Sequence, residues 1–142
     1  MNEVIKKELT AFLEERFLCV ISTVGVDSRP EAAFVAFSSN DNLELVIGTS
    51  NKSRKYQNLL QNKSVAIVIA DTSGEVQYEG NVELLTADAY DELIATGQLK
   101  KLGGYDKYRN DPTQVYLHVK PTWIRFIVHG ENDQVTELTE FA

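Results

Sequence analysis

The sequence predicts a mainly β protein in which antiparallel strands form a closed or half-closed barrel, flanked by a few helices. Short apolar or alternating runs recur along the chain and are joined by short polar turns, a pattern typical of antiparallel barrels. The first three runs, residues 17–24, 31–37 and 43–47, follow one another without a helix between them. Parallel neighbours would need such crossover helices, so the strands are predicted to be antiparallel.

Helices are predicted in three places. An amphipathic pattern indicates one over residues 2–15. A second begins near residue 53 and is expected to end with Asn62 in the left-handed conformation. A third covers residues 87–96, with Thr86 as its N-cap.

Further strands are predicted over residues 64–70, 76–85, 113–119 and 123–129. The run 64–70 is almost continuously apolar, which favours a strand buried on both faces. Gly80 lies inside the next strand and indicates a bulge or a bend. Pro121 is expected to separate the last two strands, because it lacks the N–H group that a strand ladder needs.

The remaining segments are predicted to be irregular. Residues 97–112 are polar, contain Gly103-Gly104 and Tyr105, and show no period; a loop of this length is usually functional or mobile. The acidic residues 131–142 are expected to fray. No repeat or linker divides the chain, so residues 1–142 are predicted to form one domain.

Composition narrows the range of partners and compartments. The 142 residues are 43% hydrophobic and 25% charged, which is typical of a globular protein. The net charge of −7 argues against a nucleic-acid partner. Cys19 is the one cysteine and lies in an apolar run, so it is predicted to be a buried small hydrophobe. No signal-peptide core or membrane-length apolar run is present, and we expect a cytoplasmic protein that does not contact membranes.

The turn after the third strand is the best candidate for a binding site. Residues 48–51 are turn formers, and the helix that follows carries Lys52, Arg54 and Lys55 at its start, with Ser50 or Ser53 as cap. Cations there oppose the helix dipole, whereas a bound phosphate would use both the cations and the free N–H groups. The alternative, an ordinary solvated basic turn, is equally consistent with the residues alone.

Other chemistry is sparse in the sequence. His118 and His129 are predicted on neighbouring strands, but no His-x-x-x-His or Cys-x-x-Cys spacing accompanies them, so no metal site is expected. Phosphate-loop, dinucleotide and nucleophile-elbow motifs are missing from the sequence. Any chemistry would therefore require an organic cofactor.

The chain resembles a known family at several points. These are the element Thr49-x-x-x-Ser53-Arg54-Lys55 with Asn62 after its helix, the strand 65–69, Gly80, and Pro121-x-x-Ile124-x-Phe126. On these residues it resembles the pyridoxamine 5'-phosphate oxidase-like, FMN-binding split-barrel family, in its general-stress-protein branch. The resemblance implies a six- to seven-stranded antiparallel split β-barrel with an N-terminal helix and two further helices.

The resemblance also implies a cofactor, an assembly and a set of contacts. FMN would bind in two equivalent clefts between the subunits of a homodimer. The phosphate and ribityl chain would be held by Thr49, Ser53, Arg54 and Lys55. The flavin ring would lie beside strand residues 33–38, and Gln77 falls near a family glutamine that contacts the flavin. The implied cofactor-binding residues are Ala33, Phe34, Val35, Ala36, Thr49, Ser53, Arg54, Lys55 and Gln77.

Departures from the family pattern limit the expected function. The true oxidases carry an arginine and a lysine where this chain has Ala33 and Ser38, and an Arg-x-His substrate clamp that it lacks. Their flavin-contacting tryptophan would fall at Ile127, so Trp123 is interpreted as a core residue. We therefore expect a flavin-dependent oxidoreductase of unknown small-molecule substrate, not a pyridoxamine phosphate oxidase. The alternatives are a non-enzymatic flavin-binding stress protein and a binder of another phosphorylated cofactor, such as a deazaflavin.

Overall fold

A computed structural model describes residues 2–102 and 108–141 and confirms the predicted mainly β fold. Residues 103–107, which include Gly103-Gly104 and Tyr105 of the predicted loop, lie outside the described residues. The elements follow in the order α1 (Glu3–Glu14), β1 (Leu18–Val24), the short 3-10 helix η1 (Val26–Ser28), β2 (Pro30–Ser39), β3 (Leu45–Ser50), α2 (Arg54–Gln61), β4 (Ser64–Asp71), β5 (Gly74–Leu85), α3 (Ala87–Ala95), β6 (Gln114–Val128) and β7 (Gln134–Leu138).

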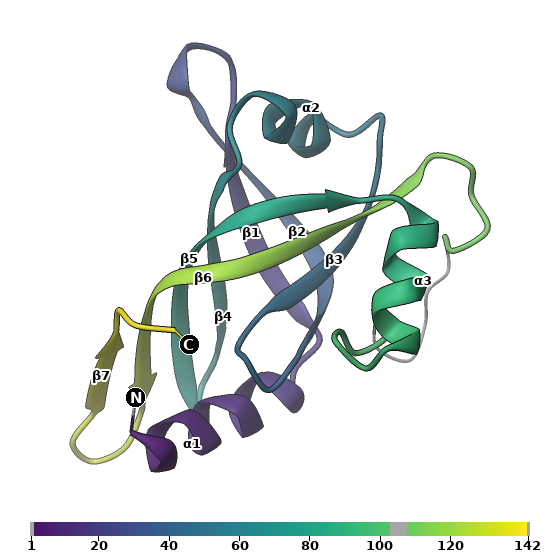
Figure 1. Cartoon of the computed structure of the whole chain (residues 1–142). Helices are drawn as coiled ribbons and strands as arrows, with labels where there is room; N and C mark the ends of the chain where they lie inside the picture. The colour runs from purple at the N-terminus through teal and green to yellow at the C-terminus, as the bar shows by residue number, and fades with distance from the viewer. Residues whose placement is uncertain (1, 103–107, 142) are drawn as a thin grey trace.

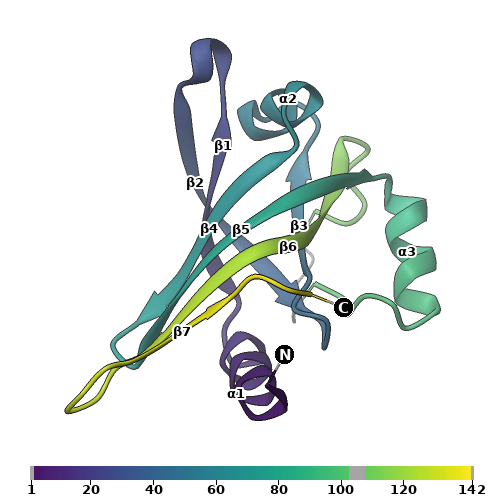
Figure 2. The same ribbon diagram turned by 60° about the vertical axis from the view of Figure 1, so that its left-hand side comes forward.

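Six strands close into an antiparallel barrel, and the seventh extends it at one side (Figure 1). The sheet order is β3-β2-β1-β4-β5-β6-β7, and pairing of β3 with β6 closes the ring. Helix α2 lies over one end of the barrel and α1 over the other, as the turned view in Figure 2 also shows. These positions confirm the split barrel with three helices.

The barrel is split between β2 and β3. These two strands are paired only through Phe37, Ser38 and Ser39 of β2. Beyond Phe37 the strands diverge: β2 continues against β1 as far as Pro30, and β3 continues against β6. The ring is thus open next to the start of α2, where the sequence predicted the binding site.

Two apolar cores stabilise this arrangement. The larger fills the barrel and contains Cys19, which is 2% exposed; burial raises the pKa of its thiol to about 12, as expected for the predicted small hydrophobe. The smaller core lies beneath α3, where the rings of Tyr90 and Tyr116 stack at 3.8 Å. Its buried members are Val46, Leu85, Tyr90, Leu99, Leu102 and Tyr116.

Helix α1 is fixed to the barrel by Arg16, just beyond its C-terminal end. The guanidinium donates to the Phe12 carbonyl at 2.7 Å, lies 3.4 Å from the centre of the Phe12 ring, and pairs with Asp71 at 2.7 Å. Asp71 also accepts two hydrogen bonds from Ser73, and these bonds, with Arg16, lower its pKa to about 2. One side chain therefore joins the helix end to the β4–β5 turn.

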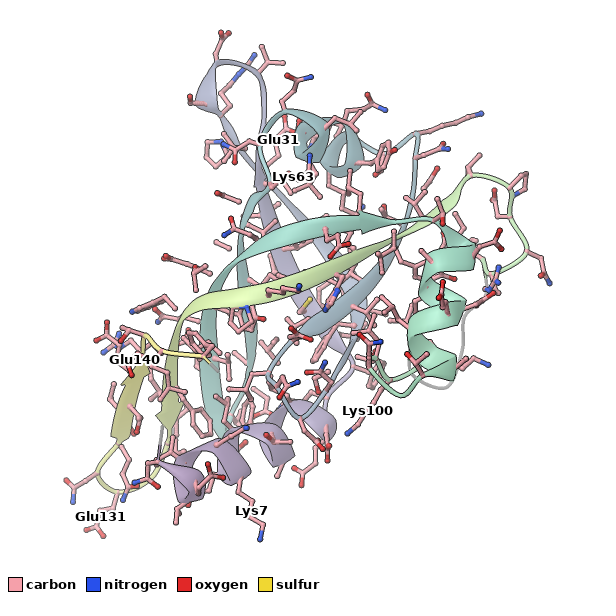
Figure 3. All side chains as sticks on the ribbon, viewed as in Figure 1. Lys7, Glu31, Lys63, Lys100, Glu131 and Glu140 are labelled. Carbon is pink, nitrogen blue, oxygen red and sulfur yellow. The ribbon has the colours of Figure 1, made fainter. Side chains whose placement is uncertain are left out.

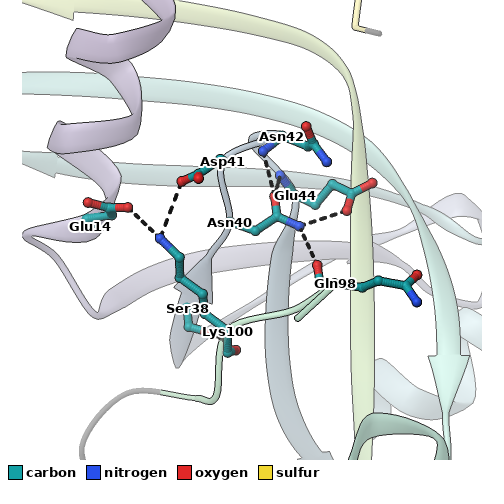
Figure 4. A network of polar contacts seen from close by, with 8 residues as sticks. All are labelled: Glu14, Ser38, Asn40, Asp41, Asn42, Glu44, Gln98 and Lys100. Carbon is teal, nitrogen blue, oxygen red and sulfur yellow. Dashed lines mark hydrogen bonds and ion pairs between the residues drawn. The ribbon is translucent and has the colours of Figure 1, made fainter. Parts of the chain in front are cut away.

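A second polar network, shown in Figure 4, holds the segment after α3 against the β2–β3 turn. Asn40 donates to Glu44 at 2.8 Å and to the carbonyl of Gln98 at 3.1 Å. Lys100 reaches Glu14 at 2.5 Å and Asp41 at 3.4 Å, and its pKa is raised by these partners, Glu14 first. These contacts of Gln98 and Lys100 hold the described start of the predicted loop 97–112 against the rest of the protein.

Gly80 confirms the predicted irregularity in β5. The register between β5 and β6 shifts between Glu79 and Gly80: Glu79 pairs with Trp123 and Gly80 with Pro121, which leaves Thr122 of β6 without a partner in the ladder. A Cβ on Gly80 would lie 2.5 Å from the Lys120 carbonyl oxygen, so only glycine fits there. Because the bulge accommodates a residue without an N–H group, Pro121 does not interrupt the strand, and β6 runs continuously from Gln114 to Val128. The prediction of two separate strands was wrong.

Part of the C-terminal tail that was expected to fray forms a strand. Residues 134–138 form β7 and pair with β6 from Ile124↔Leu138 to Val128↔Gln134. Leu138 is 9% exposed and belongs to the main core. Trp123 was predicted to be a core residue; instead it is only half-buried and donates its indole N–H to Glu137 of β7 at 2.5 Å. Both corrections arise from the same strand pairing.

Two local predictions were also wrong. Asn62 is extended, with φ −143°, because the chain passes directly into β4 and its side chain accepts the Ser64 N–H at 3.0 Å. Strand β4 is buried on one face only: Val65, Ile67 and Ile69 point into the core, whereas Val68 is 41% exposed. The described residues of this chain place no helix over the outer side of β4.

Candidate functional site

The hydroxyl groups of Thr49 and Ser53 stabilise the turn between β3 and α2. Thr49 lies at the end of β3 and is 7% exposed. Its hydroxyl donates to the Ser53 hydroxyl at 3.0 Å, and Ser53 accepts the Tyr56 N–H at 3.2 Å. Ser53 is therefore the cap, one of the two predicted candidates, while the Ser50 hydroxyl accepts the Lys52 N–H. The N–H groups of Arg54 and Lys55 belong to the first turn, where no helix carbonyl can receive them.

The three cations of this turn point to different surroundings. Lys52 is exposed and lies near Asp111, whose pKa is lowered mainly by hydrogen bonds from Thr113 and in part by Lys52. Arg54 extends toward Glu31, with 3.5 Å between Nη1 and Oε2, and its side chain is 76% exposed. Lys55 is half-buried, and desolvation lowers its pKa. Of these three cations, Arg54 and Lys55 line a hollow beside β1 and β2.

Arg54 and Lys55 border a small hollow between α2 and the first two strands. The hollow, called here the α2 hollow, has a volume of about 130 Å³. Its size suits a compact anionic group better than a ring system. The residues that line it are Ile21, Thr23, Glu31, Ala32, Ala33, Arg54 and Lys55.

Within the described part of the chain, the edge of β2 beside this hollow has backbone groups that no strand pairs with. Phe37 donates its N–H to the Phe17 carbonyl on the β1 side at 2.9 Å. Because N–H groups alternate along a strand, those of Phe34 and Ala36 point to the other side, toward β3. Pairing with β3 begins only at Phe37, so this edge offers donors and acceptors to a ligand.

Within a single copy of the chain, the predicted site residues lie in two separate places, the α2 hollow and the outer surface of the sheet. Ala33 lines the α2 hollow with Arg54 and Lys55, while Val35, also half-buried, packs against the main core. The side chains of Phe34 and Ala36 point to the outer surface of the sheet. Gln77 also lies on that outer surface, three strands away from β2 in the order β2-β1-β4-β5, which is about 14 Å.

Gln77 has the neighbours that the sequence predicted. Its side chain donates to Glu75 at 3.2 Å, so the two residues share a face as expected. Across the sheet it pairs with Val68 on β4 and Arg125 on β6. One chain therefore does not bring Gln77 together with the cations of α2.

Sequence reasoning missed three residues that organise the α2 hollow. Asn58 of α2 donates to Thr23 of β1 at 2.9 Å and to Glu31 of β2 at 2.8 Å. A signal was present, because Asn58 follows Arg54 by four residues and so shares its side of the helix. The pairing of β1 with β2, which places Thr23 opposite Glu31, is needed to see the whole cluster.

The histidines form no shared site. Both were predicted on neighbouring strands, but His118 lies in β6 and His129 directly follows the same strand. His118 contacts Glu44 at 3.2 Å and His129 contacts Asp133 at 3.4 Å. Within residues 2–102 and 108–141, no group of three or more metal-ligating side chains comes together. Over the same ranges, every helix is too short or too polar to cross a membrane.

The fold and this site define a split-barrel protein with two cations at the start of α2, beside β2. The chain belongs to the pyridoxamine 5'-phosphate oxidase family, whose model matches residues 5–128. It is 34% identical over 130 residues to a pyridoxine/pyridoxamine 5'-phosphate oxidase from Thermosynechococcus vestitus, covering 87% of this chain and 61% of that protein. The chain thus spans about half to three-fifths of the length of the curated relatives it matches.

Solved structures show the same fold at low identity. A protein related to general stress protein 26, from Clostridium acetobutylicum, has a TM-score of 0.74 at 16% identity, with 97% of each chain covered. A pyridoxamine 5'-phosphate oxidase-related, FMN-binding protein from Nostoc punctiforme has a TM-score of 0.64 at 16% identity, covering 98% of this chain and 93% of that one. These likenesses establish the split-barrel fold and its general-stress-protein neighbours.

Proposed function

We propose that the protein binds FMN and acts as a flavin-dependent oxidoreductase on a small molecule other than pyridoxamine phosphate. The observation that carries this proposal is the pair Arg54 and Lys55, set beside the open edge of β2 in a chain of this family. When bound, FMN supplies hydride- or electron-transfer chemistry that side chains lack.

The residues present fit FMN. The α2 hollow offers two cations, and the first turn of α2 adds N–H groups and the positive end of the helix dipole, all suited to a phosphate. Thr49 and Ser53 supply hydroxyls at the same turn. The free edge of β2 at Phe34 and Ala36 gives backbone donors and acceptors for the polar side of a flavin ring.

The substrate is proposed to differ from pyridoxamine phosphate because two positions offer no charge. Ala33 and Ser38 stand where the resemblance to the true oxidases places an arginine and a lysine. Ala33 is half-buried in the α2 hollow, and the Ser38 hydroxyl donates to the Lys100 carbonyl at 2.9 Å. Neither residue provides a cation for a substrate phosphate.

We further propose that two copies of the chain assemble with flavin at their interface. Leu18, Val20, Phe34 and Val68 lie on one outer face of β1, β2 and β4, named here the outer sheet face, and are 38–70% exposed. Such an apolar patch favours a protein partner. A second copy would cover it and bring its own Gln77, on the same face, toward the flavin.

The test is a titration of purified protein with FMN and with riboflavin, followed by flavin fluorescence. FMN is expected to bind at least 10-fold more tightly, because riboflavin lacks the phosphate; that ratio corresponds to about 1.4 kcal/mol. Equal affinities, or no binding of FMN, would refute the proposed site.

A second measurement separates an enzyme from a non-enzymatic flavin-binding protein. The FMN complex is mixed with NADH or NADPH under anaerobic conditions, and flavin absorbance is followed. Reduction faster than that of free FMN supports the oxidoreductase. Reduction no faster than free FMN, with tight FMN binding, favours the stress-protein alternative. The described residues that line the α2 hollow include no histidine, cysteine or tyrosine, which also favours that alternative.

A further inference from the structure

A carboxylate lies among the cations of the α2 hollow. Glu31 lines the hollow, and its Oε2 is 3.5 Å from Nη1 of Arg54. The Glu31 side chain is only 26% exposed, whereas that of Arg54 is 76% exposed. A negative charge beside a proposed phosphate site is unexpected, because like charges disfavour each other.

This carboxylate is held in place by its neighbours. Oε1 of Glu31 accepts from Asn58 at 2.8 Å, and Asn58 also donates to Thr23, which is 2% exposed. The β1–β2 hairpin packs closely on the other side, where a Cβ on Gly25 would lie 2.9 Å from Oε2. The hydrogen bond from Asn58 and the close approach of Gly25 therefore hold the Glu31 carboxylate in place, whereas Arg54 is mostly exposed.

The negative charge of Glu31 lowers the net positive charge of the α2 hollow. Arg54 and Lys55 contribute two positive charges to the α2 hollow and Glu31 removes one, which leaves one. A phosphate monoester carries about −1.5 to −2 at neutral pH. A ligand phosphate would share Arg54 with Glu31, so the carboxylate reduces the positive charge that the guanidinium presents to the ligand.

We propose that Glu31 determines the charge specificity of the α2 hollow. It keeps the affinity for phosphorylated ligands below the value that Arg54 and Lys55 alone would give, and this effect grows with the negative charge of the ligand. The inference rests on the proposed FMN site and adds a selectivity against more highly charged groups, such as a diphosphate.

The test uses Glu31→Gln, which keeps an oxygen to accept the Asn58 hydrogen bond and removes the charge. FMN affinity is expected to rise about 3- to 10-fold, as for a like-charge contact in partly exposed surroundings. Riboflavin affinity should stay within about 2-fold of wild type. Pyrophosphate, measured as a competitor of FMN, should gain more than inorganic phosphate.

Glu131→Gln is the matched control. It makes the same change in net charge, but Glu131 lies between β6 and β7, at the opposite end of the molecule from Glu31 and α2 (Figure 3). FMN affinity of this variant should equal that of wild type. An equal gain in both variants would assign the effect to overall charge and overturn the proposal.

Other outcomes are equally decisive. Unchanged or weaker FMN binding by Glu31→Gln would show that the carboxylate positions Arg54 instead of limiting affinity. If Glu31→Gln does not fold, as judged by circular dichroism, Glu31→Ala is measured in its place; failure of both to fold would make Glu31 purely structural. Wild type that prefers FMN over riboflavin keeps the proposed function even if this inference fails, whereas no preference overturns both.

Discussion

The two cations of the α2 hollow differ in exposure, and this predicts unequal effects on FMN binding when each is replaced by alanine. A charge-assisted hydrogen bond contributes roughly 1.5–3 kcal/mol, whereas an exposed ion pair contributes at most about 1 kcal/mol. Lys55 is half-buried, and Arg54 is 76% exposed. Lys55→Ala is therefore expected to raise the dissociation constant about 10- to 100-fold, and Arg54→Ala about 3- to 5-fold.

Lys52→Ala is the matched control for this series. It removes the same charge from the same turn, but Lys52 is exposed and lies near Asp111 instead of the hollow. Its dissociation constant for FMN should stay within about 2-fold of wild type. The assay is a fluorescence titration with FMN and riboflavin at one fixed ionic strength, since surface charges are screened by salt.

Several results would contradict this reasoning. A loss for Lys52→Ala equal to that for Lys55→Ala would mean that only general positive charge matters. Equal losses for FMN and riboflavin would indicate damage to the fold and not a phosphate contact. Thermal unfolding without ligand serves as a check, because cations at a helix start oppose its dipole and their removal should not lower stability.

Three further predictions concern assembly and stability. Phe34→Asp should leave the subunit folded, since Phe34 is 70% exposed, but should shift sedimentation toward a single subunit of about 16 kDa; unchanged sedimentation of a dimer would exclude the outer sheet face as its interface. Asp71→Asn should lower the free energy of unfolding at neutral pH. Because the folded pKa of Asp71 is lowered to about 2, its contribution is present above the ordinary value of 3.8 and is lost as the pH falls toward 2, so urea unfolding should show the two proteins converging over that range. Leu138→Ala should destabilise the protein by about 2 kcal/mol, the lower end for a buried leucine; an unchanged urea midpoint would mean that β7 is not part of the core.

The sequence by itself determined the features that depend on neighbouring residues. Turn chemistry and periodicity located the three helices and the antiparallel strands, and the hydroxyl caps Ser53 and Thr86 follow from local side-chain-to-backbone bonds. Gly80 marked a bulge because a side chain is excluded there. These features are local, since each depends on a few residues along one stretch of chain.

Only the tertiary structure decided how these stretches meet. The tail 134–138 becomes a strand because β6 offers it an edge, and Val68 is exposed because the described residues put no layer over the outer side of β4. The cations of α2 were visible in the sequence, but Glu31 reaches them from β2 and Asn58 joins both to Thr23 of β1. Burial and charge pairing depend on contacts between residues far apart in sequence, and strand pairing across the barrel is what creates those contacts.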